Sequence, residues 1–496
     1  MVLARLLTPA DFGVIVMVST FSMLLASFGL NGFTEGVLQL DQIDHGLASN
    51  LFWINSAVGL VLTIGFAAAG SLLARLYGNS HLASITVPMA ATIFLTNISV
   101  MHLALLKRAM RFTAVATNDI VARGASVAVA IIGGIAGWGY WALVAGAITL
   151  PLATTVGAWI LCRWVPGRPR SIPGTTAMVR YALNIYWHFI VSYSTKNLDN
   201  LLVGWRFGAP ALGFYKKAYD LFVFSASQLL SPVAPVVIAT MSRVSKDRER
   251  YRRHFLGGLS ILAFIGMWAG GDITLVGKDM IRLLLGPAWG ETGRIFSYFG
   301  PGIGIMLIYN THSWIHLSIG RADRWFRWGI IELAVTGLMF LMALPLGPAG
   351  IALAWTASFW VLAVPAFWYA GEPIQFGIGP VIRSVWKYFL ASLVAGLGCA
   401  EIVRLAPALF AGSGAAGAAT RILTVSLLFA GLYLGTVVLL YRGFAPFRQI
   451  TALLPDLLPG RRAAISSSDA DPSQAGGEAA AVNLPEPETS LLMESR

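Results

Sequence analysis

The sequence predicts an all-α membrane protein that crosses the bilayer many times, and three observations lead to this fold class. Hydrophobic residues make up 56% of the 496 residues and charged residues only 12%, about half the charged share of a typical soluble domain. The mean hydropathy is +0.70. Charge clusters and Gly/Pro breaks divide the chain into apolar segments of about 20 residues, the length of a helix that spans the hydrocarbon core.

Thirteen full spans follow from that division. They are expected near residues 12–32, 48–73, 82–105, 116–137, 139–162, 183–205, 213–240, 256–276, 294–318, 327–345, 349–370, 384–404 and 420–441. The first eight residues resemble the last two turns of another helix, so we expect fourteen spans, the first of them truncated in this chain. Fourteen spans would place both termini in the cytoplasm.

Positive charge is spread unevenly over the loops between the spans. Lys and Arg gather in alternate loops, which by the positive-inside rule are cytoplasmic. These loops contain Lys107, Arg108 and Arg111, then Arg163–Arg180, Arg243–Arg253, Arg321–Arg327, and Arg442 with Arg448. Because the net charge of +12 follows membrane topology, it does not indicate nucleic-acid binding.

Similar phrases recur in the same order about 200 residues apart, which is typical of transporters with internal repeats. The phrase RLLTPADFG from Arg5 resembles RFGAPALGF from Arg206, and GYWAL from Gly139 resembles GIAL from Gly350. The repeats predict two six-helix lobes, residues 1–165 and 175–371, related by a pseudo-two-fold axis along the membrane normal. Two additional helices are expected within 380–441. An amphipathic segment, interfacial or an ordinary linker, is expected at 442–462, followed by a disordered cytoplasmic tail at 463–496.

Charged residues inside one span give the first functional prediction. In NIYWHFIVSYSTKNLDNLLVGWR, which begins at Asn184, the residues Lys196, Asp199 and Arg206 lie along one stripe of a helix. An ionisable group at the centre of a membrane helix costs roughly 2.5–3.5 kcal/mol and usually faces a polar cavity. We therefore expect one wet face on this helix.

The stripe continues into the next span, where FYKKAYDL supplies more charge. Lys216 and Asp220 are four residues apart and are expected to pair, which leaves Lys217 and Arg206 as unpaired cations. Together with Lys196 they predict an anion site for phosphate groups. The alternative is a salt bridge between helices that only fixes their packing.

Several weaker candidates are expected to line the same cavity. Arg123 and Asp119 form an expected i,i+4 pair that either faces the cavity or extends to the interface. His188, Asn200 and His312 are further candidates for cavity lining. His312 and His316 have the spacing of two metal ligands, but the neighbouring sequence supplies no third ligand, so no metal site is predicted. No cofactor is predicted either.

The quoted phrases, with LFWINSAVGLVL, GWGYWALV and LLLGPAW, resemble the polysaccharide transporter family of lipopolysaccharide and exopolysaccharide flippases. This family belongs to the multidrug/oligosaccharidyl-lipid/polysaccharide exporter superfamily. The resemblance implies a bacterial inner-membrane flippase that carries undecaprenyl-pyrophosphate-linked oligosaccharide to the periplasmic leaflet. We also expect a monomer, with a polysaccharide polymerase and glycosyltransferases as partners. The central cations of the family correspond to Lys196, Arg206, Lys216 and Lys217, with Arg123 a weaker assignment.

Two other functions would make different demands on the sequence. An exporter of small amphipathic cations from the same superfamily would need an acidic, aromatic cavity. A membrane polymerase or ligase would need a large periplasmic loop with catalytic groups, whereas the longest external connection is roughly Val276–Gly293. We therefore expect a transporter and not an enzyme.

Overall fold

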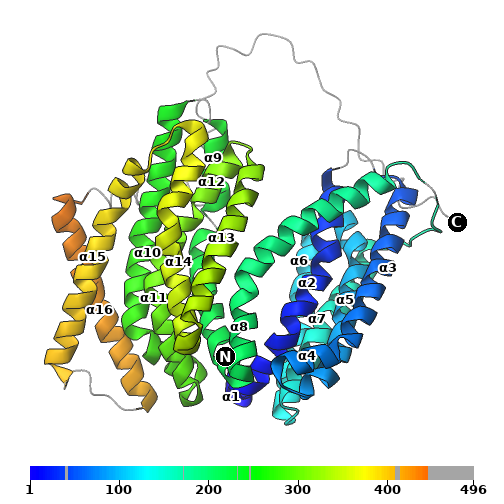
Figure 1. Ribbon diagram of the computed structural model, residues 1–496, viewed down its shortest axis with the longest axis horizontal. Coiled ribbons are helices and arrows are strands. Elements are labelled where there is room, and N and C mark those ends of the chain that lie inside the picture. Colours follow the sequence, from blue (N-terminus) through cyan, green and yellow to red (C-terminus); the bar gives the residue numbers. More distant parts are fainter. Residues whose placement is uncertain (40–42, 171, 232, 245–246, 408–413, 445–496) are drawn as a thin grey trace, which may run out of the picture. The chain divides into compact units, whose positions relative to one another are not determined.

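The computed structural model describes residues 1–39, 43–170, 172–231, 233–244, 247–407 and 414–444, and within these ranges it contains helices and no strands (Figure 1). The helices are α1 (Val2–Leu6), α2 (Pro9–Gln39), α3 (His45–Ala68), α4 (Gly70–Tyr77), α5 (His81–Arg108), α6 (Phe112–Ile135), α7 (Tyr140–Cys162), α8 (Thr175–Leu230), α9 (Ala234–Arg243), α10 (Arg248–Leu285), α11 (Gly290–Asn310), α12 (His312–Ser318), α13 (Ala322–Ala343), α14 (Gly347–Gly371), α15 (Ile378–Leu405) and α16 (Gly414–Tyr441).

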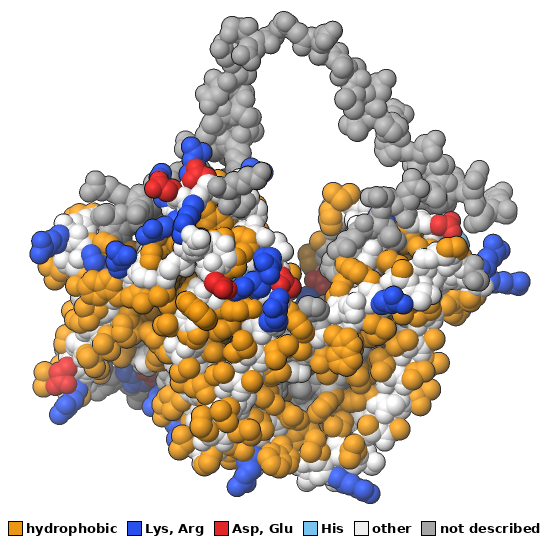
Figure 2. Space-filling model, turned by 45° about the horizontal axis from the view of Figure 1, so that its top comes forward, with side chains coloured by type: hydrophobic (Ala, Val, Ile, Leu, Met, Phe, Trp, Pro, Cys, Tyr) orange, Lys and Arg blue, Asp and Glu red, His pale blue; other side chains and the backbone are white. Residues whose placement is uncertain are grey.

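The composition of these helices confirms the multi-pass, all-α class. In the described part of the chain, nine helices are long and apolar enough to cross a membrane, or up to ten if the bent pair α8 and α9 is one span. In Figure 2, Lys and Arg gather above and below a broad hydrophobic band, as expected for a surface in contact with lipid. The expected thirteen full spans stay a prediction.

α8 is a hairpin and not one straight helix. Its backbone is non-helical at Gly208, where φ is 79° and Pro210 follows two residues later. The arms 175–207 and 209–230 run antiparallel, and two hydrogen bonds between them show this. The Tyr215 hydroxyl donates to Asp199, and four residues later the Tyr219 hydroxyl donates to the carbonyl of Lys196, three residues earlier. The turn lies where the sequence predicted a boundary between two spans.

The first arm of α8 packs along α2. The Tyr186 and Tyr193 hydroxyls donate to the backbone carbonyls of Leu24 and Thr20 at 2.9 and 2.7 Å. α2 also packs on α5, which contacts α3 and α7, and α7 lies beside α6. These five helices and the first arm of α8 form the group at the right of Figure 1.

The second group consists of α10, α11, α13 and α14, and α8 contacts all four of them. The last two helices attach to α10. The Arg421 guanidinium on α16 pairs with Asp279 on α10 at 2.5 Å, and the Tyr433 hydroxyl donates to the carbonyl of Phe264. Ser392 on α15 donates to the carbonyl of Met267.

The start of the chain and the start of the second arm of α8 contact each other reciprocally. A Cβ atom added to Gly13 would overlap the backbone carbonyl of Ala209, and one added to Gly213 would overlap the carbonyl of Pro9. Both contacts fall within the repeated phrases. Only glycine, which has no Cβ atom, allows this close approach of α2 and α8. We call these two contacts the glycine crossing.

Beside the glycine crossing, the first residues bind the second group of helices. The Trp289 indole donates to the carbonyl of Ala4 at 2.7 Å, and the Arg5 guanidinium donates to the carbonyl of Leu283 at 3.1 Å. The Phe12 and Trp289 rings meet edge to face at 5.5 Å. This end of the molecule is closed by direct contacts between the two groups.

The domain boundaries expected from the sequence stay predictions. Residues Met1–Leu440 cluster as one compact unit, which includes both expected lobes and the expected additional helices as far as residue 440. Of the expected interfacial segment at 442–462, only residues 442–444 lie within the described ranges. The expected disordered tail at 463–496 lies outside them.

Candidate functional site

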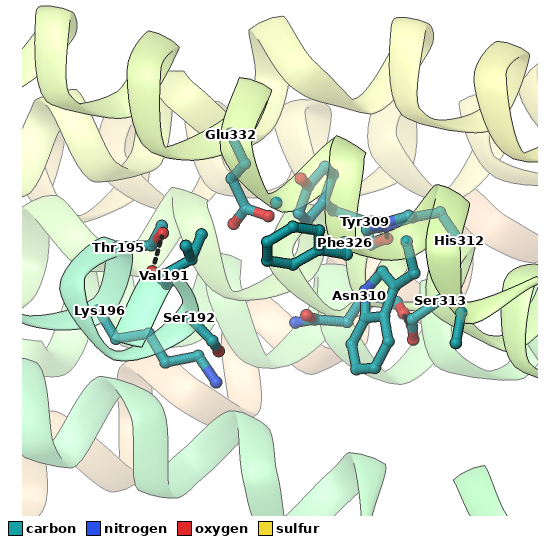
Figure 3. Close-up of a pocket in the computed structure, with 13 residues that line it drawn as sticks. Val191, Ser192, Thr195, Lys196, Tyr309, Asn310, His312, Ser313, Phe326 and Glu332 are labelled. Atoms are coloured by element: carbon teal, nitrogen blue, oxygen red, sulfur yellow. Dashed lines mark hydrogen bonds between the residues drawn. The ribbon is translucent and has the colours of Figure 1, made fainter. Parts of the chain in front are cut away.

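A cavity of about 290 Å³ lies between the first arm of α8 and the helices α11, α12 and α13 (Figure 3). We call it the Lys196 cavity. Its lining combines hydroxyl, amide, aromatic and charged side chains, and it consists of Val191, Ser192, Thr195, Lys196, Tyr309, Asn310, His312, Ser313, Ala322, Trp325, Phe326, Gly329 and Glu332. Such a mixture of apolar surface and a few polar groups is typical of ligand sites.

Two opposite charges face this cavity from different helices. The Lys196 side chain is exposed on α8 and forms no ion pair within 4 Å with any described residue. Glu332 enters from α13, where its carboxyl interacts electrostatically with the Tyr309 hydroxyl and with Lys196. That hydroxyl also accepts a hydrogen bond from the Trp328 indole at 2.8 Å. The Lys196 ammonium, which has no ion-pair partner among the described residues, is therefore available to a ligand.

Asp199 points away from the cavity and is fully buried. Its carboxylate accepts hydrogen bonds from the Tyr215 hydroxyl at 2.7 Å, the Trp355 indole at 2.9 Å and the backbone N–H of Asn200 at 2.7 Å. These donors come from both arms of α8 and from α14. Asp199 thus joins three helical segments, and it is placed apart from the Lys196 ammonium although the two residues are one turn apart.

Lys216 and Lys217 on the second arm of α8 have partners of their own. Lys216 pairs with Asp220 at 2.7 Å, which confirms the expected i,i+4 pair. The Lys217 ammonium lies 4.0 Å from the centre of the Phe12 ring on α2. Neither lysine is among the described residues that line the Lys196 cavity.

Arg206 lies just before the turn of α8 and is exposed, with its guanidinium carbon 5.8 Å from the centre of the Phe207 ring. It too is absent from the described lining of the Lys196 cavity. The structure therefore brings one of the four expected central cations into this cavity and places the other three near the turn of α8 and along its second arm.

Arg123 lies in a different cavity, of about 490 Å³, between α2, α5, α6 and α7. Its guanidinium pairs with Asp119 at 2.8 Å, as the i,i+4 spacing predicted, and both residues line the cavity. Other lining residues include serine and threonine hydroxyls, most of which donate to carbonyls of their own helices. This second cavity carries no unpaired charge among the residues described.

The three other candidates differ in position. His312 lines the Lys196 cavity, and its Nδ1 lies 2.6 Å from the carbonyl oxygen of Tyr309. Asn200 is buried and donates to the side-chain oxygen of Asn197 at 3.2 Å. His188 belongs to α8, but its side chain lies outside the described residues.

Two solved transporter structures share this fold. The lipid II flippase MurJ, in an inward closed conformation, aligns over 89% of this chain and 95% of its own, with a TM-score of 0.72 and 15% identity. A multidrug resistance MATE family transporter of the MOP superfamily, in an inward-facing conformation, aligns over 75% of this chain and 92% of its own, with a TM-score of 0.62 and 13% identity. At these identities the likeness establishes the fold.

The model of the family described as polysaccharide biosynthesis protein matches residues 2–293 of the chain. The chain belongs to this family. Relatives include the succinoglycan biosynthesis transport protein ExoT of Rhizobium meliloti, which is 22% identical over 68% of each chain. The teichuronic acid biosynthesis protein TuaB of Bacillus subtilis is 21% identical over 74% of this chain and 76% of its own. The lipopolysaccharide biosynthesis protein WzxC of Escherichia coli is 22% identical over 58% and 59%.

These relatives confirm the resemblance to the polysaccharide transporter family of the MOP superfamily. The sequence interpretation nevertheless missed much of the lining of the Lys196 cavity. Asn310 and Trp325 had no signal of their own in the sequence. Glu332 did have one, because it is the single ionisable residue between Trp328 and Ala343, and a lone charge in an apolar span indicates a polar environment.

Proposed function

We propose that this protein moves undecaprenyl-pyrophosphate-linked oligosaccharide units from the cytoplasmic to the periplasmic leaflet of a bacterial inner membrane. The product would serve lipopolysaccharide or exopolysaccharide synthesis. The observation that carries the proposal is the exposed Lys196 ammonium in a polar cavity formed by α8, α11, α12 and α13. The names of the relatives, a succinoglycan transport protein and a lipid II flippase, support it.

The chemistry of the Lys196 cavity suits a diphosphate headgroup. A diphosphate cannot enter hydrocarbon without losing its hydration, which costs several kcal/mol per charge even after relaxation. The Lys196 ammonium supplies a positive charge and three hydrogen-bond donors, and Ser192 and Asn310 add polar groups to the same lining. The polyprenyl chain would stay in the lipid.

Transport would proceed by alternating access, with residues 1–165 and 175–371 rocking about the site. The contacts at the glycine crossing close one end of the molecule and support this scheme. In a second arrangement of the two lobes, the headgroup on its way to the other leaflet would meet Arg206, Lys216 and Lys217. Arg123 would line the path in the first lobe. Glycosyltransferases would supply the substrate and a polymerase would use the product.

The test is to delete the gene and identify the lipid-linked sugars that accumulate. We expect an accumulated lipid-linked repeat unit and loss of the exported polymer, both restored by the wild-type gene and by Lys278→Ala. Lys278 is an exposed lysine on α10 outside the cavity, so it is a matched control. Lys196→Ala should leave the defect in place although the protein is made. Normal polymer export in the deletion strain would contradict the proposal.

A second candidate is the export of small amphipathic cations. Glu332 lies beside the Tyr309 ring and shares the cavity with Trp325, and a carboxylate with aromatic rings attracts such cations. If this is the function, the deletion strain will retain more of a fluorescent lipophilic cation than the parent strain and will accumulate no lipid-linked sugar. Unchanged retention of the cation together with an accumulated lipid-linked sugar would eliminate cation export.

A further inference from the structure

The wall of the Lys196 cavity opposite α8 combines aromatic rings with hydrogen-bond acceptors. Trp325 and Phe326 come from α13, and 42% of the Trp325 surface is exposed. Figure 3 shows the Phe326 ring between the Glu332 carboxylate and the Asn310 amide, and both polar groups point into the space in front of Lys196. Aromatic faces beside directed polar groups make a surface that can bind a ring with apolar faces and hydroxyl edges.

The polar groups on this wall are mainly acceptors. Asn310 donates through its amide nitrogen to the carbonyl of Met306 at 2.9 Å, and its side-chain oxygen accepts no hydrogen bond from the described residues. Glu332 is acceptor-only when ionised, and it lines the cavity, so its carboxylate oxygens can accept from a ligand. Ligand groups that donate, such as sugar hydroxyls, fit these acceptors, whereas an anionic group beside Glu332 meets like-charge repulsion.

The size of the cavity limits what it can hold. About 290 Å³ is near the lower end of ligand pockets, which are about 300–1,000 Å³. It can therefore enclose the headgroup next to Lys196 and one adjoining ring, but not a whole oligosaccharide. The part of the substrate that contacts this wall is the sugar attached directly to the diphosphate.

We propose that the α13 wall, through Trp325, Glu332 and Asn310, binds the sugar attached to the diphosphate and selects an uncharged, hydroxyl-bearing sugar over an acidic one. This rests on the proposed function, because it requires the diphosphate to bind at Lys196. Glu332 then has two roles in one place. It balances Lys196 while the cavity is empty, and it accepts hydroxyl donors and excludes carboxylates when the cavity is filled.

The experiment measures binding of three probes to the purified full-length protein in lipid nanodiscs. The probes are geranyl diphosphate, its glucose ester and its glucuronic acid ester, of which the last two differ only at C6. We expect the glucose ester to bind about tenfold more tightly than geranyl diphosphate, the size of one hydrogen bond to a charged group. The glucuronic acid ester should bind no more tightly than geranyl diphosphate.

Two variants assign the effect to the wall. Trp325→Ala should remove the advantage of the glucose ester over geranyl diphosphate, so that the variant binds these two probes with equal affinity. Glu332→Gln should bring the two sugar esters within about threefold of each other, because the repulsive charge is gone. The controls are Trp368→Ala and Glu401→Gln. Trp368 lies on α14 and is 66% exposed, and the Glu401 carboxylate on α15 lies 3.5 Å from the Arg404 guanidinium. Both lie outside the cavity lining and should behave as wild type.

The outcomes separate this inference from the function on which it rests. If all three probes bind the wild-type protein with equal affinity, or the glucuronic acid ester binds most tightly, the sugar selection is wrong while the anion site stands. If folded protein binds none of the probes, the proposed anion site fails. Should a variant not give a single gel-filtration peak, the three-probe series on the wild-type protein still decides.

Discussion

The two arms of α8 carry the same charged residue type and use it differently. On the first arm, Lys196 is exposed in a cavity and has no ion pair among the described residues. On the second arm, Lys216 is paired with Asp220 at 2.7 Å and Lys217 lies 4.0 Å over Phe12. A cation in an apolar segment is therefore not in itself a binding site. Whether such a cation can bind a ligand depends on whether another side chain of the protein already pairs with it.

The same comparison holds for the two acids nearest to Lys196. Asp199, three residues away, receives three hydrogen bonds and joins α8 to α14. Glu332, 136 positions further along the sequence, is the acid that faces the lysine. A buried carboxylate with all its donors in place holds a structure together, whereas one at a cavity wall can serve a ligand.

The largest effect is expected from Asp199→Ala. The change leaves the Tyr215 hydroxyl and the Trp355 indole buried without their acceptor, at about 1–3 kcal/mol for each donor. We expect a loss of stability of roughly 2–6 kcal/mol, measured by thermal unfolding in detergent. Asp220→Ala is the control, because that carboxylate is about half exposed. Equal melting temperatures for the two variants would show that Asp199 does not join the arms.

The next largest loss of stability is expected at the glycine crossing, where the second arm of α8 packs on α2. Gly13→Ala and Gly213→Ala each force a Cβ atom against a backbone carbonyl, and we expect each to cost about 1–3 kcal/mol. Gly65→Ala on α3 is the control, since no atom lies within 4 Å of its added Cβ. Thermal unfolding of the three variants compares them. A loss for Gly65→Ala as large as for the other two would refute a specific contact.

A smaller effect is expected from Lys217→Ala. The change removes the contact between the ammonium and the Phe12 ring, which contributes about 0.5–2 kcal/mol. Lys217→Arg should keep most of it, since the arginine side chain also stacks on aromatic rings. The measurement is again thermal unfolding in detergent. If Lys217→Ala is as stable as the wild type, the partner of this lysine contributes nothing and the contrast between the two arms weakens.

Features set by local spacing could be predicted from the sequence. The pairs of Lys216 with Asp220 and of Arg123 with Asp119 follow from the helical period alone, and both are present. The repeated phrases at Arg5 and Arg206 also have a physical reason in the structure. Gly13 and Gly213 each accept the backbone of the other phrase, so both phrases need a glycine at that place.

Features set by packing between distant helices could not be predicted. The stripe containing Lys196 and Asp199 indicated one wet face, but Trp355 and Tyr215 approach that stripe and bury Asp199. Nothing in the sequence near residue 196 indicates that α13 supplies Glu332. Helical periodicity gives the face on which a residue lies, and only the neighbouring helices determine what that face meets.

The most direct test of the central claim is the affinity of the purified protein for geranyl diphosphate in nanodiscs, compared between the wild type, Lys196→Ala and the control Lys278→Ala. Because Lys196 is the cation that faces the cavity, Lys196→Ala should weaken binding by about tenfold or more, while Lys278→Ala should bind as the wild type does. Unchanged affinity in folded Lys196→Ala would contradict the account.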